Sequence, residues 1–115
     1  MYLTVDAGSS TPLFEQLVAG IRAQVIDGSL APGERLPAAR DLADSLDVNV
    51  HTILRAYQVL RDEGFLDLRR GRGAVVTSRS LDYRQLASDI DRLIAEAKRL
   101  ELTPGALGAL IREAW

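Results

Sequence analysis

Arginine and glycine alternate in one short segment of the chain, Arg70-Gly71-Arg72-Gly73. A guanidinium group forms paired hydrogen bonds with a phosphate or with the edge of a guanine, and it suits these contacts better than a lysine ammonium does. Glycine allows a tight turn and lets the backbone approach a ligand closely. Because an arginine stands on each side of Gly71, we predict that Arg70, Gly71 and Arg72 contact nucleic acid.

A second group of polar residues precedes this segment. Arg40 stands near the start of one expected helix, and Asn49, His51 and Thr52 stand in the first turn of the next. In helix-turn-helix proteins the start of the second helix meets the base edges, and its free backbone amides suit phosphate. Arg55 follows His51 by one turn on the expected exposed face. We predict that these five residues contact DNA.

The same residues also have interpretations without DNA. Arg40 stands four residues before Asp44, and a surface ion pair at this spacing contributes little to stability. Arg55 has Asp62 and Glu63 as alternative partners. For the first turn of the next helix, the alternative is that Asn49 is only a cap, Thr52 only satisfies its return bond and His51 faces solvent. These alternatives stay open at the level of the sequence.

Apolar spacing and turn residues predict the elements that hold these side chains. They are a helix from Thr11-Pro12 to about Gly28, a short strand at Glu34–Leu36, a helix from about Pro37 to Leu46, a helix that begins at Asn49 and ends at Gly64, and strands at Phe65–Arg69 and Ala74–Ser78. Thr11 is expected to cap the first helix, and Asp47 to tolerate a left-handed backbone in the turn before Asn49. This order describes a helix-turn-helix with a β-hairpin wing.

The stretch from Pro12 to about Thr77 resembles the N-terminal winged helix-turn-helix domain of GntR-type transcriptional regulators. The most specific matches are Leu-Pro-x-x-Arg at 36–40, Glu-Gly-Phe-Leu at 63–66 and Gly-Arg-Gly at 71–73. Residues 49–57 and the short remainder of the chain look like the YtrA-like branch. The resemblance implies a dimeric DNA-binding repressor, in which Arg40 contacts DNA and C-terminal helices hold the dimer together.

The chain also departs from the pattern of that family. Ala38-Ala39 stand where Ser-Glu is usual, and Asp47 stands where glycine is usual. Val50 and Leu54 occupy positions that are often basic. The second helix of the motif is therefore poorer in arginine than in much of the family, and the bases that it reads are left open.

Beyond Ser80 the apolar residues follow a heptad pattern, as in a coiled-coil seam. The members of this stripe, spaced by 4, 3, 4 and 3 residues, are Leu86, Ile90, Leu93, Ala97 and Leu100. Thr103-Pro104 predicts the start of a second short helix, whose apolar residues include Leu107, Leu110 and Ile111. Two such helices cannot bury their apolar faces alone, so they either fold back on the winged domain or pair with a second chain.

Pairing with a second chain is favoured, because helix-turn-helix proteins bind paired half-sites as dimers. We expect Tyr83 and Trp115 to pack at the same dimer interface. A small apolar effector bound between the tail helices is an open alternative, and no residue names such a ligand.

Composition excludes several classes of site. The 115 residues contain no cysteine and one histidine, so neither a thiolate site nor a multi-histidine metal cage forms within one chain. No paired-carboxylate or phosphate-loop signature is present, so we expect no cofactor, no metal and no enzymatic activity. No apolar run reaches the roughly 18 residues of a membrane span, and no signal pattern opens the chain. A cytoplasmic protein without membrane contact is expected.

The net charge of −2 does not by itself argue for nucleic acid. Local charge matters more, because phosphate contacts are local. Residues 55–79 carry six arginines against three acidic residues, so the basic charge gathers where DNA contact is predicted.

We therefore expect a mainly α protein with a small antiparallel β-hairpin. Residues 1–11 form an arm, 12–79 a winged helix-turn-helix DNA-binding domain, and 80–115 a two-helix dimerisation tail. The expected function is that of a dimeric repressor bound to double-stranded DNA at a palindromic operator. The alternative is a winged-helix protein-interaction module that docks on an acidic partner, for which the near-neutral net charge is natural.

Overall fold

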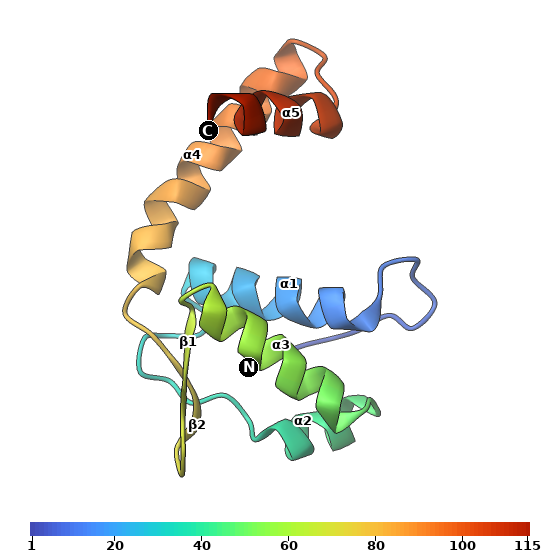
Figure 1. The fold of residues 1–115 in the computed structure, drawn as a ribbon, viewed down its shortest axis with the longest axis vertical. Helices are drawn as coiled ribbons and strands as arrows, with labels where there is room; N and C mark the ends of the chain where they lie inside the picture. Colours follow the sequence, from blue (N-terminus) through green and yellow to red (C-terminus); the bar gives the residue numbers. More distant parts are fainter. The chain divides into compact units, whose positions relative to one another are not determined.

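Five helices and two strands follow one another along residues 1–115, all of which the computed structural model describes (Figure 1). They are α1 (Leu13–Asp27), α2 (Ala39–Leu46), α3 (Val50–Asp62), β1 (Leu66–Arg69), β2 (Gly73–Val76), α4 (Ser80–Arg99) and α5 (Pro104–Ala114). The chain divides into two compact units, Met1–Arg84 and Gln85–Trp115. This order confirms the predicted fold class. None of the helices is long and apolar enough to cross a membrane.

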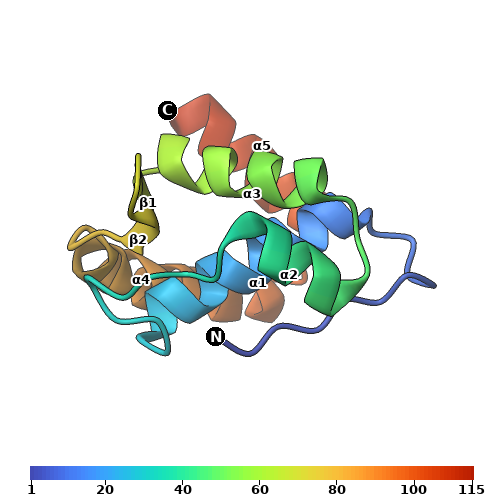
Figure 2. The same ribbon diagram turned by 90° about the horizontal axis from the view of Figure 1, so that it is seen from below.

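The core of the first unit lies between α1, α2, α3 and the hairpin (Figure 2). Leu17, Ile21 and Val25 recur every four residues on α1 and are completely buried. Ile53 and Leu60 of α3 are completely buried against them. Helical spacing therefore places one apolar face of each helix inward and leaves the opposite face of α3 free for another role.

The turn between α2 and α3 confirms two predictions. Asp47 adopts a left-handed backbone (φ 54°, ψ 50°), which aspartate tolerates better than most residues. The backbone N–H of Val48 then donates to the carbonyl of Ala43 at 3.0 Å, which ends α2. The Asn49 side chain accepts a hydrogen bond from the N–H of His51 at 2.8 Å and caps α3. This local chemistry sets the direction in which α3 leaves the turn.

The wing is a two-stranded antiparallel hairpin in which Leu66 pairs with Val76 and Arg69 with Gly73. The N–H of Arg72 donates to the carbonyl of Arg69 at 3.0 Å and closes the turn. Gly71 is the third residue of that turn and has φ 81°, a conformation that favours glycine. The tip is therefore tight, with arginines on both sides of Gly71.

The predicted strand at Glu34–Leu36 is only a single bridge, between Arg35 and Val75. Leu36 does donate its N–H to the carbonyl of Ala74 at 2.9 Å. The following residue is Pro37, which has no N–H and cannot extend the ladder. The segment therefore lies along the wing without becoming a third strand.

Two predicted helix starts are wrong. Thr11 does not cap α1, because Pro12 occupies the cap position with an extended backbone (ψ 145°) and no side-chain hydrogen bond. The carbonyl of Thr11 instead accepts a hydrogen bond from the Gln16 side chain at 2.7 Å. The second helix begins at Ala39 and not near Pro37, because Ala38 is also extended (ψ 144°).

The first turn of α4 belongs to the first unit. The ring of Tyr83 packs on Phe65, with centroids 4.4 Å apart, and its hydroxyl donates to the carbonyl of Glu63 at 2.9 Å. Ser80 is completely buried and donates to the carbonyl of Thr77 at 3.2 Å. Tyr83, which the sequence places at a dimer interface, therefore packs on the winged domain, and the first unit extends past residue 79 to Arg84.

The second unit consists of the rest of α4 and of α5. The Thr103 hydroxyl accepts from the N–H of Ala106 at 3.1 Å, so the predicted cap of α5 is confirmed. Ala97 is the only buried hydrophobic residue of this unit. A groove of about 480 Å³ runs between the two helices, and its lining includes Ile90, Leu93, Leu107 and Ile111. The unit thus has almost no core of its own.

We expect Tyr57→Phe to lower the free energy of unfolding by about 1–2 kcal/mol. The buried Tyr57 hydroxyl donates to the carbonyl of Pro37 at 2.7 Å, and the variant leaves that carbonyl without this donor. Burial raises the pKa of the Tyr57 phenol, so the hydroxyl keeps its proton across the neutral range. Urea unfolding measures the change. Tyr2→Phe is the control, because Tyr2 is 83% exposed, and equal midpoints for both variants would contradict the prediction.

Candidate nucleic-acid interface

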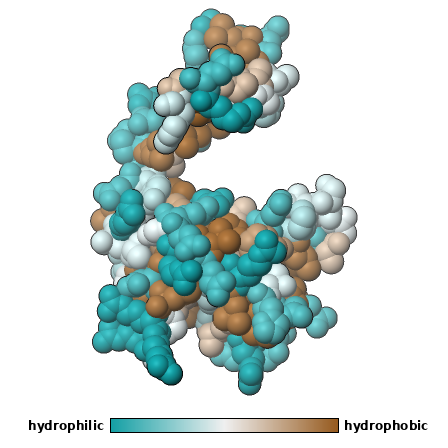
Figure 3. Space-filling view, viewed as in Figure 1, coloured by the Kyte–Doolittle hydropathy of each residue, from teal (hydrophilic) through white to brown (hydrophobic).

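The predicted DNA-contacting elements lie at one end of the first unit. In Figure 1, α2, the start of α3 and the tip of the β1–β2 hairpin all lie at the lower end of this unit. Figure 2 views the molecule from that side, with α2 and α3 facing the reader and the hairpin next to them. The protruding end of the hairpin is strongly hydrophilic (Figure 3). The tertiary structure thus brings together segments that are separate in the sequence.

The outer face of α3 is formed by residues at positions i, i+3 and i+7, which are His51, Leu54 and Gln58. All three are exposed, and the opposite face, with Ile53, is buried. A helix that lies in a groove presents this kind of continuous outward face. The first turn of α3 is therefore free to approach a ligand.

The polar side chains in that first turn differ in whether they already make a hydrogen bond within the chain. The Asn49 oxygen is occupied by the cap, whereas the half-buried Thr52 hydroxyl makes no hydrogen bond within the chain. His51 is exposed and also makes no side-chain hydrogen bond. The structure therefore leaves polar groups of His51 and Thr52 available next to the amides of the helix start.

Arg55 lies against α1 and does not pair with an acidic residue. Its guanidinium carbon lies 4.2 Å from the centre of the Phe14 ring. Glu63 pairs with Arg22 at 2.7 Å, and Asp62 pairs with its neighbour Arg61. The interpretation of Arg55 as a partner of Asp62 or Glu63 is thus wrong. The stacked guanidinium is held in place while its N–H groups stay open to solvent.

Salt bridges neutralise some of the arginines and leave others unpaired. Those that pair with a carboxylate are Arg22, Arg61, Arg69, Arg92 and Arg99. Arg40, Arg70 and Arg72 are exposed and form no salt bridge. The alternative in which Arg40 pairs with Asp44 is therefore not observed. These three guanidinium groups lie on the elements at the same end of the unit, and no salt bridge neutralises their charges.

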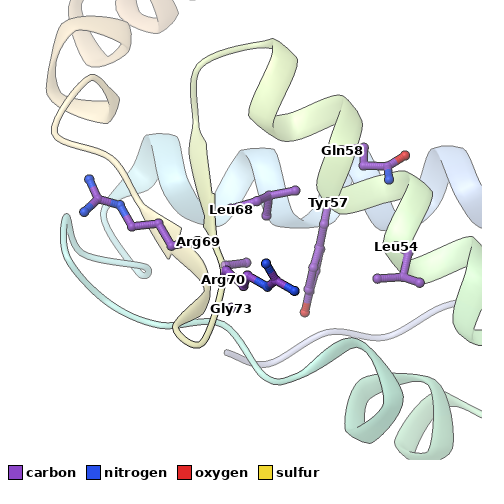
Figure 4. A pocket seen from close by; sticks show the side chains of 8 residues that line it. Leu54, Tyr57, Gln58, Leu68, Arg69, Arg70 and Gly73 are labelled. Carbon is purple, nitrogen blue, oxygen red and sulfur yellow. The ribbon is translucent and has the colours of Figure 1, made fainter.

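The two faces of the hairpin carry different arginines (Figure 4). Arg69 points away from α3 and pairs with Asp67 at 2.7 Å. Arg70 extends toward α3 and lines a hollow of about 250 Å³ that Tyr57 also lines. Arg72 lines another hollow, together with Asp67 and Arg69. The wing therefore presents guanidinium groups on both of its sides.

Three residues of this surface were not predicted as site residues. Leu54 and Gln58 continue the exposed face of His51, and their spacing along α3 was the available signal. Arg35 is exposed, forms no salt bridge and lies along the wing through its bridge to Val75. Its position depends on a contact between distant segments, so nothing in the local sequence marks it.

Comparison with known families agrees with this geometry. The profile described as "Bacterial regulatory proteins, gntR family" matches residues 13–76, which run from α1 to the end of β2. The chain belongs to the GntR family. The predicted resemblance is confirmed, and so is the expected class of protein, a helix-turn-helix transcriptional regulator.

Individual relatives point to the YtrA-like members of the GntR family. The HTH-type transcriptional repressor YtrA of Bacillus subtilis is 35% identical over 75 residues, which are 65% of this chain and 58% of that protein. The HTH-type transcriptional regulator Rv1152 of Mycobacterium tuberculosis is 36% identical over 106 residues, covering 89% of this chain and 84% of that protein. The chain thus spans little more than half of the first relative and most of the second.

A solved structure shows the same relationship for the fold of this GntR-family chain. YtrA from Sulfolobus acidocaldarius, a GntR-family transcription factor, superposes with a TM-score of 0.62 at 36% identity. The superposition covers 81% of this chain and 97% of that one. The winged helix-turn-helix architecture is therefore confirmed.

Proposed function

We propose that this GntR-family regulator is a repressor that binds a palindromic operator as a homodimer, with one winged unit on each half-site. The observation that carries the proposal is that Arg40, Arg70 and Arg72 are exposed and unpaired at the end of the unit where α3 begins. The similarity of the chain to a Bacillus subtilis protein named as a transcriptional repressor supports repression over activation.

In this proposal α3 enters the major groove with its first turn. Asn49, His51 and Thr52 face base edges and the nearest phosphate, because the N-terminus of the helix is the positive end of its dipole. Arg40 and Arg55 bind phosphates on the two sides of α3. These contacts set the position of the helix, while the base-facing side chains supply sequence preference.

The wing contributes a second set of backbone contacts. Gly71 keeps the tip narrow through its positive φ, so the backbone and the flanking guanidinium groups of Arg70 and Arg72 can approach a phosphate. Because these contacts go to the sugar-phosphate backbone, they add affinity on every sequence and fix the register of α3.

The second unit supports dimerisation. A unit of this size rarely folds alone without an additional stabilising device such as oligomerisation. Trp115 is fully exposed, and seven further large apolar residues are 38–54% exposed: Leu86, Ile90, Leu93, Ile94, Leu100, Leu110 and Ile111. Leu107 is half-buried in the groove between α4 and α5. We infer that these helices pair with those of a second copy, with Ala97 packed beneath the interface.

We expect the protein to bind DNA from upstream of its own gene, with an affinity that depends strongly on salt. Four phosphate-binding arginines in each protomer, Arg40, Arg55, Arg70 and Arg72, correspond to a slope of log K against log salt of about −7 for the dimer. Fluorescence anisotropy between about 0.05 and 0.3 M salt measures this slope. A shuffled duplex of equal length is the control. Absence of binding at the lowest salt concentration would contradict the proposal.

A further inference from the structure

One large apolar side chain stands in the middle of an otherwise polar face. Leu54 is 42% exposed and lies on the outer side of α3, between His51 and Gln58. It is not part of the core, whose α3 residues lie on the opposite side of the helix. The side chain is therefore free to contact a partner, and its surroundings indicate which kind.

Leu54 lies next to a mostly apolar hollow that a positively charged side chain borders. Leu54 shares a hollow of about 250 Å³ with Tyr57, Leu68 and Ala74. Arg70 and Leu54 extend toward Tyr57 from the hairpin and from α3, respectively (Figure 4). Arg70 forms no salt bridge, so an unneutralised cation borders the apolar surface. A hydrophobic protein segment gains nothing from that cation, whereas a duplex offers a phosphate to the cation and base edges to the leucine.

The major-groove edges of the bases differ in what they offer to leucine. Thymine presents a C5 methyl group beside its O4 acceptor, whereas cytosine, guanine and adenine present donors or acceptors without a methyl group. Covering such a polar group without replacing its hydrogen bond with water is unfavourable. Contact with a thymine methyl instead removes apolar surface of both partners from water.

We propose that Leu54 is a specificity-determining residue that selects a thymine in each operator half-site through its C5 methyl group. This inference rests on the proposed function, because it requires α3 to lie in the major groove. Leu54 follows His51 by about 4.5 Å along the helix axis, roughly one base-pair step. The selected thymine therefore lies next to the base pair that His51 faces.

The experiment uses the full chain and an operator selected from a random pool of duplexes. Each thymine of one half-site is replaced in turn by deoxyuridine, which lacks only the methyl group. At one position the wild-type protein is expected to lose affinity by about fourfold, the value for one buried methyl group. Leu54→Ala is expected to bind both duplexes equally, and Leu54→Met to retain the sensitivity. Leu81→Ala, which removes another exposed leucine, is the matched control and keeps the wild-type response.

The outcomes separate this inference from the function on which it rests. Binding of the selected operator without any methyl-sensitive position overturns the role of Leu54 and leaves the repressor proposal intact. The same holds if Leu54→Ala keeps the fourfold sensitivity. Failure to select any duplex from the pool contradicts the proposed function itself. Circular dichroism confirms that each variant is folded before binding is compared.

Discussion

Replacing both wing-tip arginines, Arg70→Ala with Arg72→Ala, is expected to weaken operator binding on the order of a thousandfold at about 0.15 M salt. A dimer carries two copies of each residue, so the double variant removes four phosphate contacts. Release of the counterions condensed on four phosphates accounts for this factor. The slope of log K against log salt is expected to fall by about 4. Anisotropy titrations at several salt concentrations measure both quantities.

The matched control removes the same charge elsewhere. Arg92→Ala with Arg99→Ala deletes two exposed arginines of α4 that already pair with Asp89 and Glu96. This control is expected to leave the salt slope unchanged. Because wing contacts go to the backbone, the Arg70 and Arg72 variant should lose a similar factor on a shuffled duplex. A loss confined to the operator would show base recognition by the wing and contradict this assignment.

Ile90→Asp with Leu93→Asp is expected to convert the dimer into monomers and to weaken operator binding by at least about a hundredfold. Both side chains line the groove between α4 and α5 and are more than two-fifths exposed. Burying two carboxylates in each copy of an apolar interface costs more than the interface gains. Without the dimer, each winged unit must bind its half-site independently, and the effective concentration of the second unit is lost.

Sedimentation velocity measures the oligomeric state of the Ile90 and Leu93 variant, and circular dichroism checks that the first unit stays folded. Ser88→Asp with Ala95→Asp is the control, since both positions are exposed and lie outside the heptad stripe. It should remain dimeric. A variant that sediments as a dimer in spite of Asp at 90 and 93 would mean that the tail is not the dimerisation element.

Much of the winged fold follows from short-range chemistry that can be recognised in the sequence. Asn49 caps α3 and Asp47 takes the left-handed turn because both outcomes depend on groups a few residues away. The same holds for Thr103, which caps α5. Thr11 failed as a cap even though its local pattern was similar, because Pro12 takes the cap position, and the Thr11 carbonyl accepts a hydrogen bond from the Gln16 side chain. A capping pattern is therefore dependable only where no neighbouring residue takes the cap position.

The class of protein could also be predicted from the residue types. Arg70-Gly71-Arg72 and the polar first turn of α3 indicated DNA contact, and the heptad stripe from Leu86 to Leu100 indicated an apolar tail. These inferences needed only side-chain chemistry and spacing, since helical and strand periodicity assign each residue to a face.

Which arginines are free, and what surrounds them, came from packing between distant segments. Arg69 and Arg70 are adjacent in sequence, yet Arg69 pairs with Asp67 while Arg70 turns toward Tyr57. Arg55 rests on Phe14 of α1, and Tyr83 of α4 rests on Phe65. Leu54 borders the hollow of the proposed site because the hairpin folds next to α3. Residue type and spacing establish the available chemistry, but partners far apart along the chain meet only when the core between them closes, so the tertiary structure selects which groups face the ligand.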